Sequence, residues 1–197
     1  NIQGLVANDY TQSVSLLANK DAYRYNLLTA PGLIADPVNY ASHISVINSL
    51  INTVQNRGDS MTVLDLVGYG ANVLEVTSNA TAYDTSYAAT YYPWIITIDP
   101  NSGKTVWVPP STMIASVYAF NDNVGATWNA PAGVTRGTIP TAIKAERFLS
   151  QKNRDSLYQQ NINPIATFQG SGVTVFGQKT LQKKKSALDR VNVRRLL

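Results

Sequence analysis

The sequence has no cysteine and a single histidine, His43, among its 197 residues. The lack of cysteine excludes a disulfide framework, a thiolate metal site and a thiol nucleophile. A metal site at His43 would have no further histidine or cysteine ligand, and a catalytic triad would need His43 as its base. No apolar run reaches the ~20 residues that a membrane-spanning helix needs, so we expect no direct membrane partner.

Charge is unevenly distributed along the chain. Residues 1–135 hold four basic and nine acidic side chains, a net of −5, whereas residues 136–197 hold twelve basic and three acidic ones, a net of +9. Three interpretations are open. The basic part can be a solvated face, it can attract the acidic part of another copy, or it can bind nucleic acid. The last is disfavoured because the basic part lacks the interleaved aromatic residues that stack bases.

Five short motifs follow one another in the second half of the chain. They are rich in proline, glycine, aromatic residues and arginine, which fix the backbone direction or offer a surface to a partner. None has the composition of a catalytic constellation, so they favour a protein that packs against copies of itself. The motifs are Tyr91-Tyr92-Pro93-Trp94, Val108-Pro109-Pro110-Ser111, Ala130-Pro131-Ala132-Gly133, Ile162-Asn163-Pro164-Ile165 and Val191-Asn192-Val193-Arg194-Arg195-Leu196.

The first half of the chain predicts a strand, a helix and a second strand. Apolar residues recur at helical spacing between Pro37 and Arg57, with Asp36 as the expected N-cap and Gly58 as the stop. We predict strands over 23–29 and 61–67 on either side of this helix. Because this order implies a parallel pair joined by a crossover, we expect a mixed α/β fold with parallel and antiparallel strands flanked by helices.

The second half predicts shorter elements. We expect a helix over 71–77, a strand over 91–98 that returns as a hairpin over 104–108, and a helix over 112–120 capped by Ser111. A long ordered loop over 121–140 follows, and then a segment over 143–149 that fits a strand or a helix. The last predicted elements are a helix over 153–160, a hairpin formed by 165–168 and 173–176, and a final strand or helix start over 191–197.

Catalytic chemistry finds little support. The run from Gly68 to Val73 lies between a predicted strand and a predicted helix, as a dinucleotide fingerprint does, but Val73 stands where the third glycine belongs. His43 is expected on the polar side of its helix, and Asp65 is expected to be a turn or cap acceptor. We therefore predict no catalytic, cofactor-binding or metal-binding residue and no enzymatic activity, with a nucleotide-binding α/β enzyme as the remaining alternative.

The candidate functional residues are those suited to contacts between subunits. Trp128 lies within the Gly/Pro-rich loop and offers a large apolar surface. The basic run and the arginines near the C-terminus can bind carboxylates. If Arg194 and Arg195 are extended, they point in opposite directions, so that one pairs internally and the other faces outward. The predicted interface residues are Trp128, Lys183, Lys184, Lys185, Arg190, Arg194 and Arg195.

Taken together, these motifs resemble the tail sheath protein family of contractile bacteriophages. The resemblance runs from about Asn26 to the end and is densest from Tyr87 to Leu197. Besides the five motifs, it includes Asn26-Leu27-Leu28-Thr29-Ala30-Pro31-Gly32, Ala115-Ser116-Val117-Tyr118-Ala119, Asn121-Asp122, Trp128-Asn129, Leu157-Tyr158 and Gly177-Gln178-Lys179-Thr180-Leu181.

The resemblance implies a structural protein without cofactors. Sheath subunits form stacked hexameric rings around a tail tube and turn as rigid bodies when the sheath contracts, which drives the tube through the bacterial envelope. The implied partners are other copies of the subunit, the tube protein, the baseplate and the tail terminator, in a virion assembled in the host cytoplasm. Residues 1–197 are expected to be one core α/β domain, a fragment without the family's N-terminal arm and C-terminal tube-facing portion. A bacteriocin or type VI secretion sheath is the alternative within this class.

Overall fold

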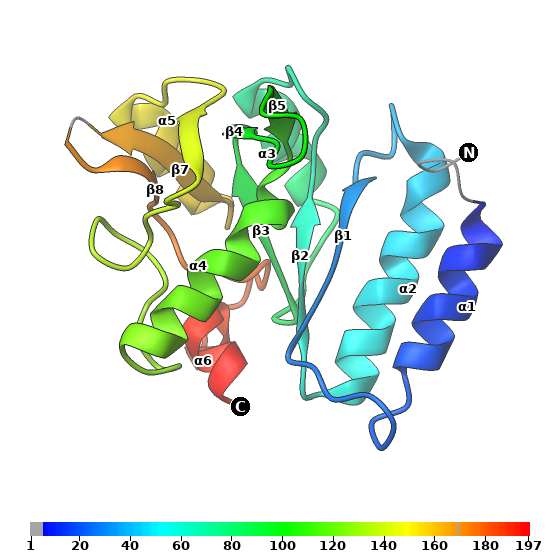
Figure 1. Ribbon diagram of the computed structural model, residues 1–197. Coiled ribbons are helices and arrows are strands. Elements are labelled where there is room, and N and C mark those ends of the chain that lie inside the picture. Colours follow the sequence, from blue (N-terminus) through cyan, green and yellow to red (C-terminus); the bar gives the residue numbers. More distant parts are fainter. Residues whose placement is uncertain (1–5, 169) are drawn as a thin grey trace.

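The structure is a computed structural model that describes residues 6–168 and 170–197, and it contains a mixed sheet covered by helices (Figure 1). The main sheet has the strand order β1-β2-β3-β7-β8, in which β1, β2, β3 and β7 are parallel and β8 is antiparallel to β7. The expected mixed α/β fold is confirmed. The strands of this sheet are β1 (Leu27–Ile34), β2 (Met61–Asp65), β3 (Ala88–Tyr92), β7 (Asn163–Phe168) and β8 (Gly172–Val175).

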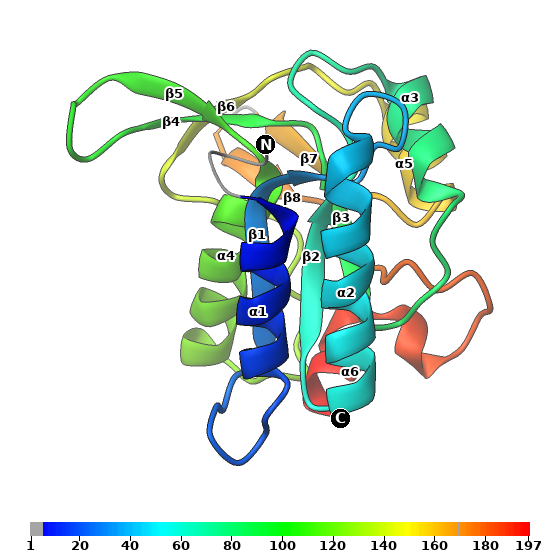
Figure 2. The same ribbon diagram turned by 90° about the vertical axis from the view of Figure 1, so that its right-hand side faces the viewer.

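A second, antiparallel sheet has the order β5-β4-β6. Its strands β4 and β5 form the hairpin that the turn chemistry of residues 99–103 predicts, and this hairpin projects from the body of the molecule (Figure 2). The strands of this sheet are β4 (Ile95–Ile98), β5 (Thr105–Val108) and β6 (Ala142–Ala145).

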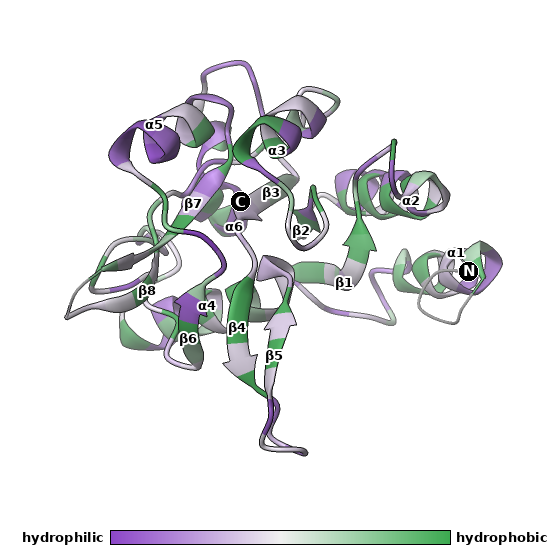
Figure 3. Cartoon of the chain, turned by 90° about the horizontal axis from the view of Figure 1, so that it is seen from above, coloured by the Kyte–Doolittle hydropathy of each residue, from purple (hydrophilic) through white to green (hydrophobic). Residues whose placement is uncertain are grey.

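Helices cover both faces of the main sheet, as the view from above shows (Figure 3). Neighbouring strand residues point to opposite faces, so Val63 and Tyr91 enter one hydrophobic core with α4 and α6, whereas Leu64 and Tyr92 enter the other with α2, α3 and α5. The helices are α1 (Ala7–Leu17), α2 (Ala41–Arg57), α3 (Val73–Ala80), α4 (Pro110–Val124), α5 (Gln151–Gln159) and α6 (Val191–Leu196), with a short 3₁₀ turn at Ala187–Asp189.

Helix α2 begins later than the sequence predicts. The Asp36 carboxylate accepts hydrogen bonds from the main-chain nitrogens of Val38 and Asn39, as a cap would, but the bonds close a turn and the helix starts only at Ala41. Val38, which lies within the predicted helix, is 84% exposed. The predicted stop is confirmed, since Gly58 ends the helix in the left-handed conformation with φ +76°.

The first strand is shifted from its predicted position at 23–29. β1 continues through Pro31 and Gly32 to Ile34, and its register with β2 changes between Thr29 and Ile34. Proline is tolerated there because β1 is an edge strand, where its missing N–H group leaves no ladder bond unmade.

The predicted strand over 91–98 is two strands in different sheets. β3 ends at Tyr92, and β4 begins at Ile95 after a cis peptide bond between Tyr92 and Pro93. Pro93 has no N–H group to donate, and the chain leaves the main sheet at this point.

Helix α4 differs at its start and extends further. Pro110 occupies the first helical position, and Pro109 is the N-cap without a side-chain bond. Ser111 does not cap the helix, because its hydroxyl donates to the Asp65 carboxylate at the end of β2. The helix extends to Val124, so the ordered loop is shorter than the predicted span of 121–140.

The remaining elements follow the predictions with small shifts at their ends. The hairpin β7–β8 and the helices α3 and α5 are confirmed. The segment 143–149 is a strand only as far as Ala145, where β6 ends, and residues 146–149 are neither helix nor strand. The chain ends with α6, a helix rather than a strand.

Candidate functional site

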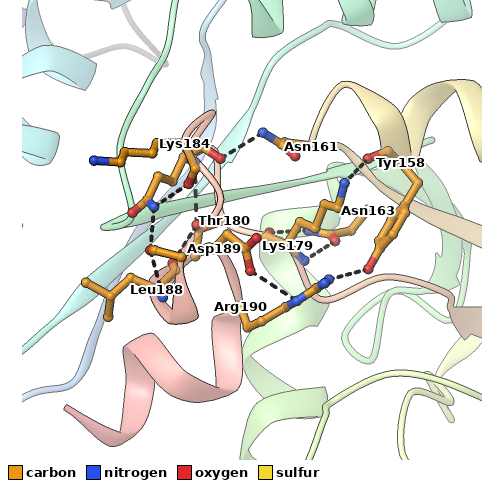
Figure 4. Close-up of polar contacts among 11 residues, drawn as sticks. Tyr158, Asn161, Asn163, Lys179, Thr180, Lys184, Leu188, Asp189 and Arg190 are labelled. Carbon is orange, nitrogen blue, oxygen red and sulfur yellow. Dashed lines mark hydrogen bonds and ion pairs between the residues drawn. The ribbon is translucent and has the colours of Figure 1, made fainter.

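The basic run Lys183-Lys184-Lys185 belongs to a compact loop over residues 179–190, here called the basic loop, which lies between β8 and α6. The Thr180 hydroxyl donates to the Leu188 carbonyl oxygen at 2.9 Å, and the Gln182 amide donates to the Lys184 carbonyl oxygen and the Ser186 hydroxyl, both at 2.6 Å (Figure 4). These bonds close the loop from residue 179 to residue 190 and leave the lysines at its tip.

Asn163 anchors this loop to the main sheet. Its buried amide nitrogen donates to the carbonyl oxygens of Thr90, at 3.0 Å, and Lys179, at 2.8 Å, while its amide oxygen accepts from the Lys179 main-chain nitrogen at 2.6 Å. A side chain at Gly177 would have its Cβ 2.7 Å from that amide oxygen, so glycine is required there. The motifs that contain Asn163 and Gly177 are thereby explained by one contact between β7 and the basic loop.

The loop residues also close the C-terminal end of α5. The Lys179 ammonium donates to the Tyr158 carbonyl oxygen at 2.7 Å and lies 4.2 Å from the centre of the Tyr158 ring. Arg190 donates to the Tyr158 hydroxyl at 2.7 Å and forms an ion pair with Asp189 at 3.1 Å. After α5, Asn161 adopts φ +60° and its amide donates to the Gln182 carbonyl oxygen at 2.9 Å.

The three consecutive lysines differ in their surroundings. The Lys183 ammonium donates to the Thr81 carbonyl oxygen at the end of α3, at 2.7 Å, and its main-chain nitrogen donates to the Asp84 carboxylate at 2.9 Å. Lys184 and Lys185 are exposed, and the described part of the chain gives their ammonium groups no hydrogen bond or ion pair. Lys183 therefore has a structural role that its two neighbours lack.

A cleft of about 460 Å³ lies between this loop and the ends of α3 and α5. Four cations line it, and the only carboxylate among its lining residues is Asp189. Burial lowers the pKa of Lys179, and the positive charges of Arg190 and Lys185 lower it further. The other cationic lining residue is Lys183, and the aromatic and amide side chains of the lining are Tyr83, Tyr158, Gln159, Gln160, Asn161 and Gln182.

Arg194 and Arg195 lie on helix α6, so they are not extended, and neither is directed outward. Arg195 forms a bidentate ion pair with Asp122 of α4. Arg194 donates to the Gly58 carbonyl oxygen at 2.9 Å and lies 4.2 Å from the centre of the Tyr87 ring. The expectation that one of them faces outward is wrong, because the helix directs both side chains onto the core.

Trp128 lies in the loop after α4, away from the cleft lining, and is 65% exposed. Its carbonyl oxygen accepts from the Asn192 amide at 2.7 Å, which ties the loop to α6. The exposed indole is consistent with the predicted contact role, which stays a prediction.

The acidic first part of the chain offers fewer free carboxylates than its net charge suggests. Asp36 and Asp65 are buried, and Asp59 and Asp122 pair with arginines of the same chain. A broad acidic surface that opposes the basic loop is therefore not built from these four residues.

His43 and Asp65 are buried structural groups. The His43 ring accepts a hydrogen bond from the Ile34 main-chain nitrogen at 2.9 Å, so its expected place on the polar side of α2 is wrong. The spacing of His43, Ile47, Leu50 and Val54 already places it on the apolar stripe. Asp65 accepts two bonds from Ser111, and burial raises the pKa of Asp65 to about 7.

The turn from Gly68 to Val73 is occupied by the chain's own side chains. Glu146 accepts from the Gly70 main-chain nitrogen at 2.8 Å, and Arg147 donates to the Gly70 carbonyl oxygen. In the described ranges, no three histidine, aspartate or glutamate residues are grouped so as to hold a metal ion. No described helix is long and apolar enough to cross a bilayer.

Comparison with known proteins identifies the family. Residues 3–181 match the model of the phage tail sheath protein central domain. The tail sheath protein of Vibrio phage KVP40 is 29% identical over 210 residues, covering 96% of this chain and 31% of that protein. The tail sheath protein of Enterobacteria phage T4 is 38% identical over 128 residues, covering 65% of this chain and 18% of that protein. This chain thus spans less than a third of either relative.

Solved structures share the fold. The sheath complex of an extracellular contractile injection system, PVC, in its contracted state matches with a TM-score of 0.67 and 25% identity, covering 93% of this chain and 48% of that one. The contracted helical sheath of the anti-feeding prophage matches with a TM-score of 0.68 and 23% identity, covering 98% and 49%. Together with the match over residues 3–181, these findings show that the chain belongs to the phage tail sheath protein family.

Proposed function

We propose that the protein is a structural subunit of a contractile tail sheath. In this role it polymerises as helical hexameric rings around a tail tube, and contraction by rigid-body rotation of the subunits drives the tube through the bacterial envelope. The observation that carries the proposal is the family match over residues 3–181. The described residues are proposed to be one core domain of the subunit.

The structure suits a part that rotates without refolding. Two hydrophobic cores lie on opposite faces of one sheet, and the C-terminal helix is fixed to both α2 and α4 by arginines. Closely packed interiors resist continuous deformation, so such a subunit can exchange one set of neighbours for another while its fold is kept.

The proposed partners are other copies of the subunit, the tube protein, the baseplate and the tail terminator, in a virion assembled in the host cytoplasm. We expect no catalytic activity and no direct contact with nucleic acid or membrane. Trp128, Lys184 and Lys185 are proposed as exposed contact residues, with Lys183 and Arg190 in the cleft. Arg194 and Arg195 support the interface from inside the subunit.

A sheath of a related contractile injection system is the second candidate, favoured by the fold shared with the contracted PVC sheath. A nucleotide-binding enzyme is less favoured, because Glu146 and Arg147 already bond the main chain at Gly70.

Electron microscopy of the full-length protein tests the proposal. The expected result is long hollow cylinders of stacked rings. A protein that stays dispersed at every concentration and salt tried, or one whose melting temperature rises with added nucleotide, would contradict it.

A further inference from the structure

The cleft between the basic loop and the ends of α3 and α5 has more positive charge than the chain itself neutralises. Lys179, Lys183, Lys185 and Arg190 line it, against the single carboxylate of Asp189. The C-termini of α3 and α5 also border it, and each carries about half a negative charge. The lining therefore keeps an excess of about two positive charges. This sum leaves out the Asp84 carboxylate, which is not part of the lining and accepts a hydrogen bond from the Lys183 main-chain nitrogen.

Donors remain available in the cleft after the internal bonds are made. An ammonium group has three donors, and Lys179 and Lys183 each use one on a carbonyl oxygen. Arg190 has five donors, of which one bonds the Tyr158 hydroxyl, and its guanidinium forms an ion pair with Asp189. Lys185 has its ammonium free in the described chain. The site is thus held rigid by its own bonds and can still bind an anion.

The geometry favours separate carboxylates over one compact phosphate. Phosphate is typically held by main-chain N–H groups at a helix N-terminus or in a nest. Here the lining includes the C-terminal ends of α3 and α5, whose carbonyl oxygens at Thr81 and Tyr158 accept hydrogen bonds from lysines. The cations are spread between the end of α3, at Lys183, and the end of α5, at Lys179 and Arg190. Amide and tyrosine side chains between them can bond a peptide main chain.

We propose that this cleft binds an extended acidic peptide segment of a neighbouring subunit, whose carboxylates pair with Lys185, Arg190 and Lys179. The inference rests on the proposed function for the identity of the partner. The binding itself can be measured on the 197-residue chain, so the failure of cylinder assembly and the failure of peptide binding are separate results.

The test is fluorescence anisotropy of a labelled peptide of alternating glutamate and glycine, titrated with the chain at low salt. A peptide with glutamine in place of glutamate is the uncharged control. Lys185→Gln removes a lining cation that makes no internal bond, and Lys152→Gln removes an exposed lysine of α5 that lies outside the lining. The two variants have the same net charge, which makes Lys152→Gln the matched control.

The glutamate peptide is expected to bind and the glutamine peptide is not. Lys185→Gln is expected to weaken binding about threefold, as a partly exposed ion pair does, and the double variant Lys185→Gln and Arg190→Gln about tenfold, with folding checked by thermal melting. Lys152→Gln is expected to bind as the parent does.

Several results would overturn the inference. These are no binding of the glutamate peptide, equal losses in Lys152→Gln and Lys185→Gln, displacement of the peptide by an equal concentration of inorganic phosphate, or binding of a DNA oligonucleotide that Lys185→Gln alone abolishes. The first two would leave only diffuse attraction, and the last two would assign the cleft to phosphate or to nucleic acid.

Discussion

Arg195 of α6 and Asp122 of α4 form a bidentate ion pair that joins positions 73 residues apart. The Arg195 side chain is 3% exposed and lies 4.5 Å from the centre of the Tyr118 ring. Tyr118 in turn shares a hydrogen bond of 2.6 Å with Tyr91 of β3. The C-terminal helix is thereby tied through α4 to the centre of the main sheet.

Asp122→Asn is expected to destabilise the fold. The substitution leaves the buried Arg195 charge without its partner and is expected to lower the free energy of unfolding by about 2–3 kcal/mol. This is less than a fully buried pair loses, because the Asp122 side chain is 30% exposed. Urea unfolding measures the change. The control is Asp155→Asn on the exposed surface of α5, expected within about 0.5 kcal/mol of the parent. Equal stability of the two variants would show that the pair contributes nothing.

Asn163→Ala is expected to lower stability by about 3 kcal/mol, because the Thr90 and Lys179 main-chain groups lose their buried partner. For a chain of this length, that is a fall of roughly 6–12 °C in melting temperature. Asn101→Ala at the exposed tip of the β4–β5 hairpin serves as the control. A shift of about 0.5–1 kcal/mol changes the melting temperature by about 2 °C. If Asn163→Ala melts within about 2 °C of the control, the hydrogen bonds of Asn163 do not stabilise the contact between β3, β7 and the basic loop.

Stability is expected to fall as the pH rises from about 4 to about 7 because of Asp65. Burial raises the pKa of this carboxyl to about 7 in the folded protein, whereas it is about 3.9 in an unfolded chain. The folded state therefore binds the extra proton in this window, and its advantage is lost as that proton leaves, at up to about 1.4 kcal/mol per pH unit.

Asp65→Asn isolates this effect, since it keeps the shape and cannot ionise. The difference in unfolding free energy between the parent and Asp65→Asn is expected to change steadily across pH 4–7 and to level off outside it. His43, whose pKa burial lowers, contributes the opposite slope and cancels in the difference. A difference that does not vary with pH would contradict the assignment.

Neutralising the exposed lysines is expected to change assembly without changing folding. In the full-length protein, Lys184→Gln with Lys185→Gln should leave the melting temperature within about 2 °C, as surface changes do, while the formation or the contraction of cylinders is altered. Adding Lys183→Gln should lower the melting temperature as well, because its ammonium bonds the Thr81 carbonyl oxygen. Unchanged assembly and triggering in the double variant would count against charge pairing between subunits.

The sequence predicts the parts of the fold that depend on local pattern. The periodicity of α2, the buried run of β2 and the turn residues of the two hairpins were enough for the α/β fold and most elements. The break at Pro93 was missed because aromatic and β-branched residues continue on both sides of it, and local pattern does not say that they join different sheets.

The sequence predicts which residue types form the site, but not how those residues are arranged in space. The basic run was visible, but whether a lysine closes a helix end, as Lys183 does, or stays free, as Lys185 does, depends on distant carbonyl oxygens. The burial of Arg194 and Arg195 likewise depends on Gly58 and Asp122, which lie far away in the sequence. Asn163 and Gly177 belong to two separate sequence motifs, and only the folded structure shows that they lie in contact.

The proposed function requires this domain to move as a rigid body when the sheath contracts. Electron microscopy of cylinders of the full-length protein, before and after contraction, tests this requirement. We predict that residues 6–168 and 170–197 superpose as one unit in both forms, with subunits rotated relative to one another. Cylinders in which the main sheet or helix α6 rearranges between the two forms, or the absence of any cylinder, would contradict this account.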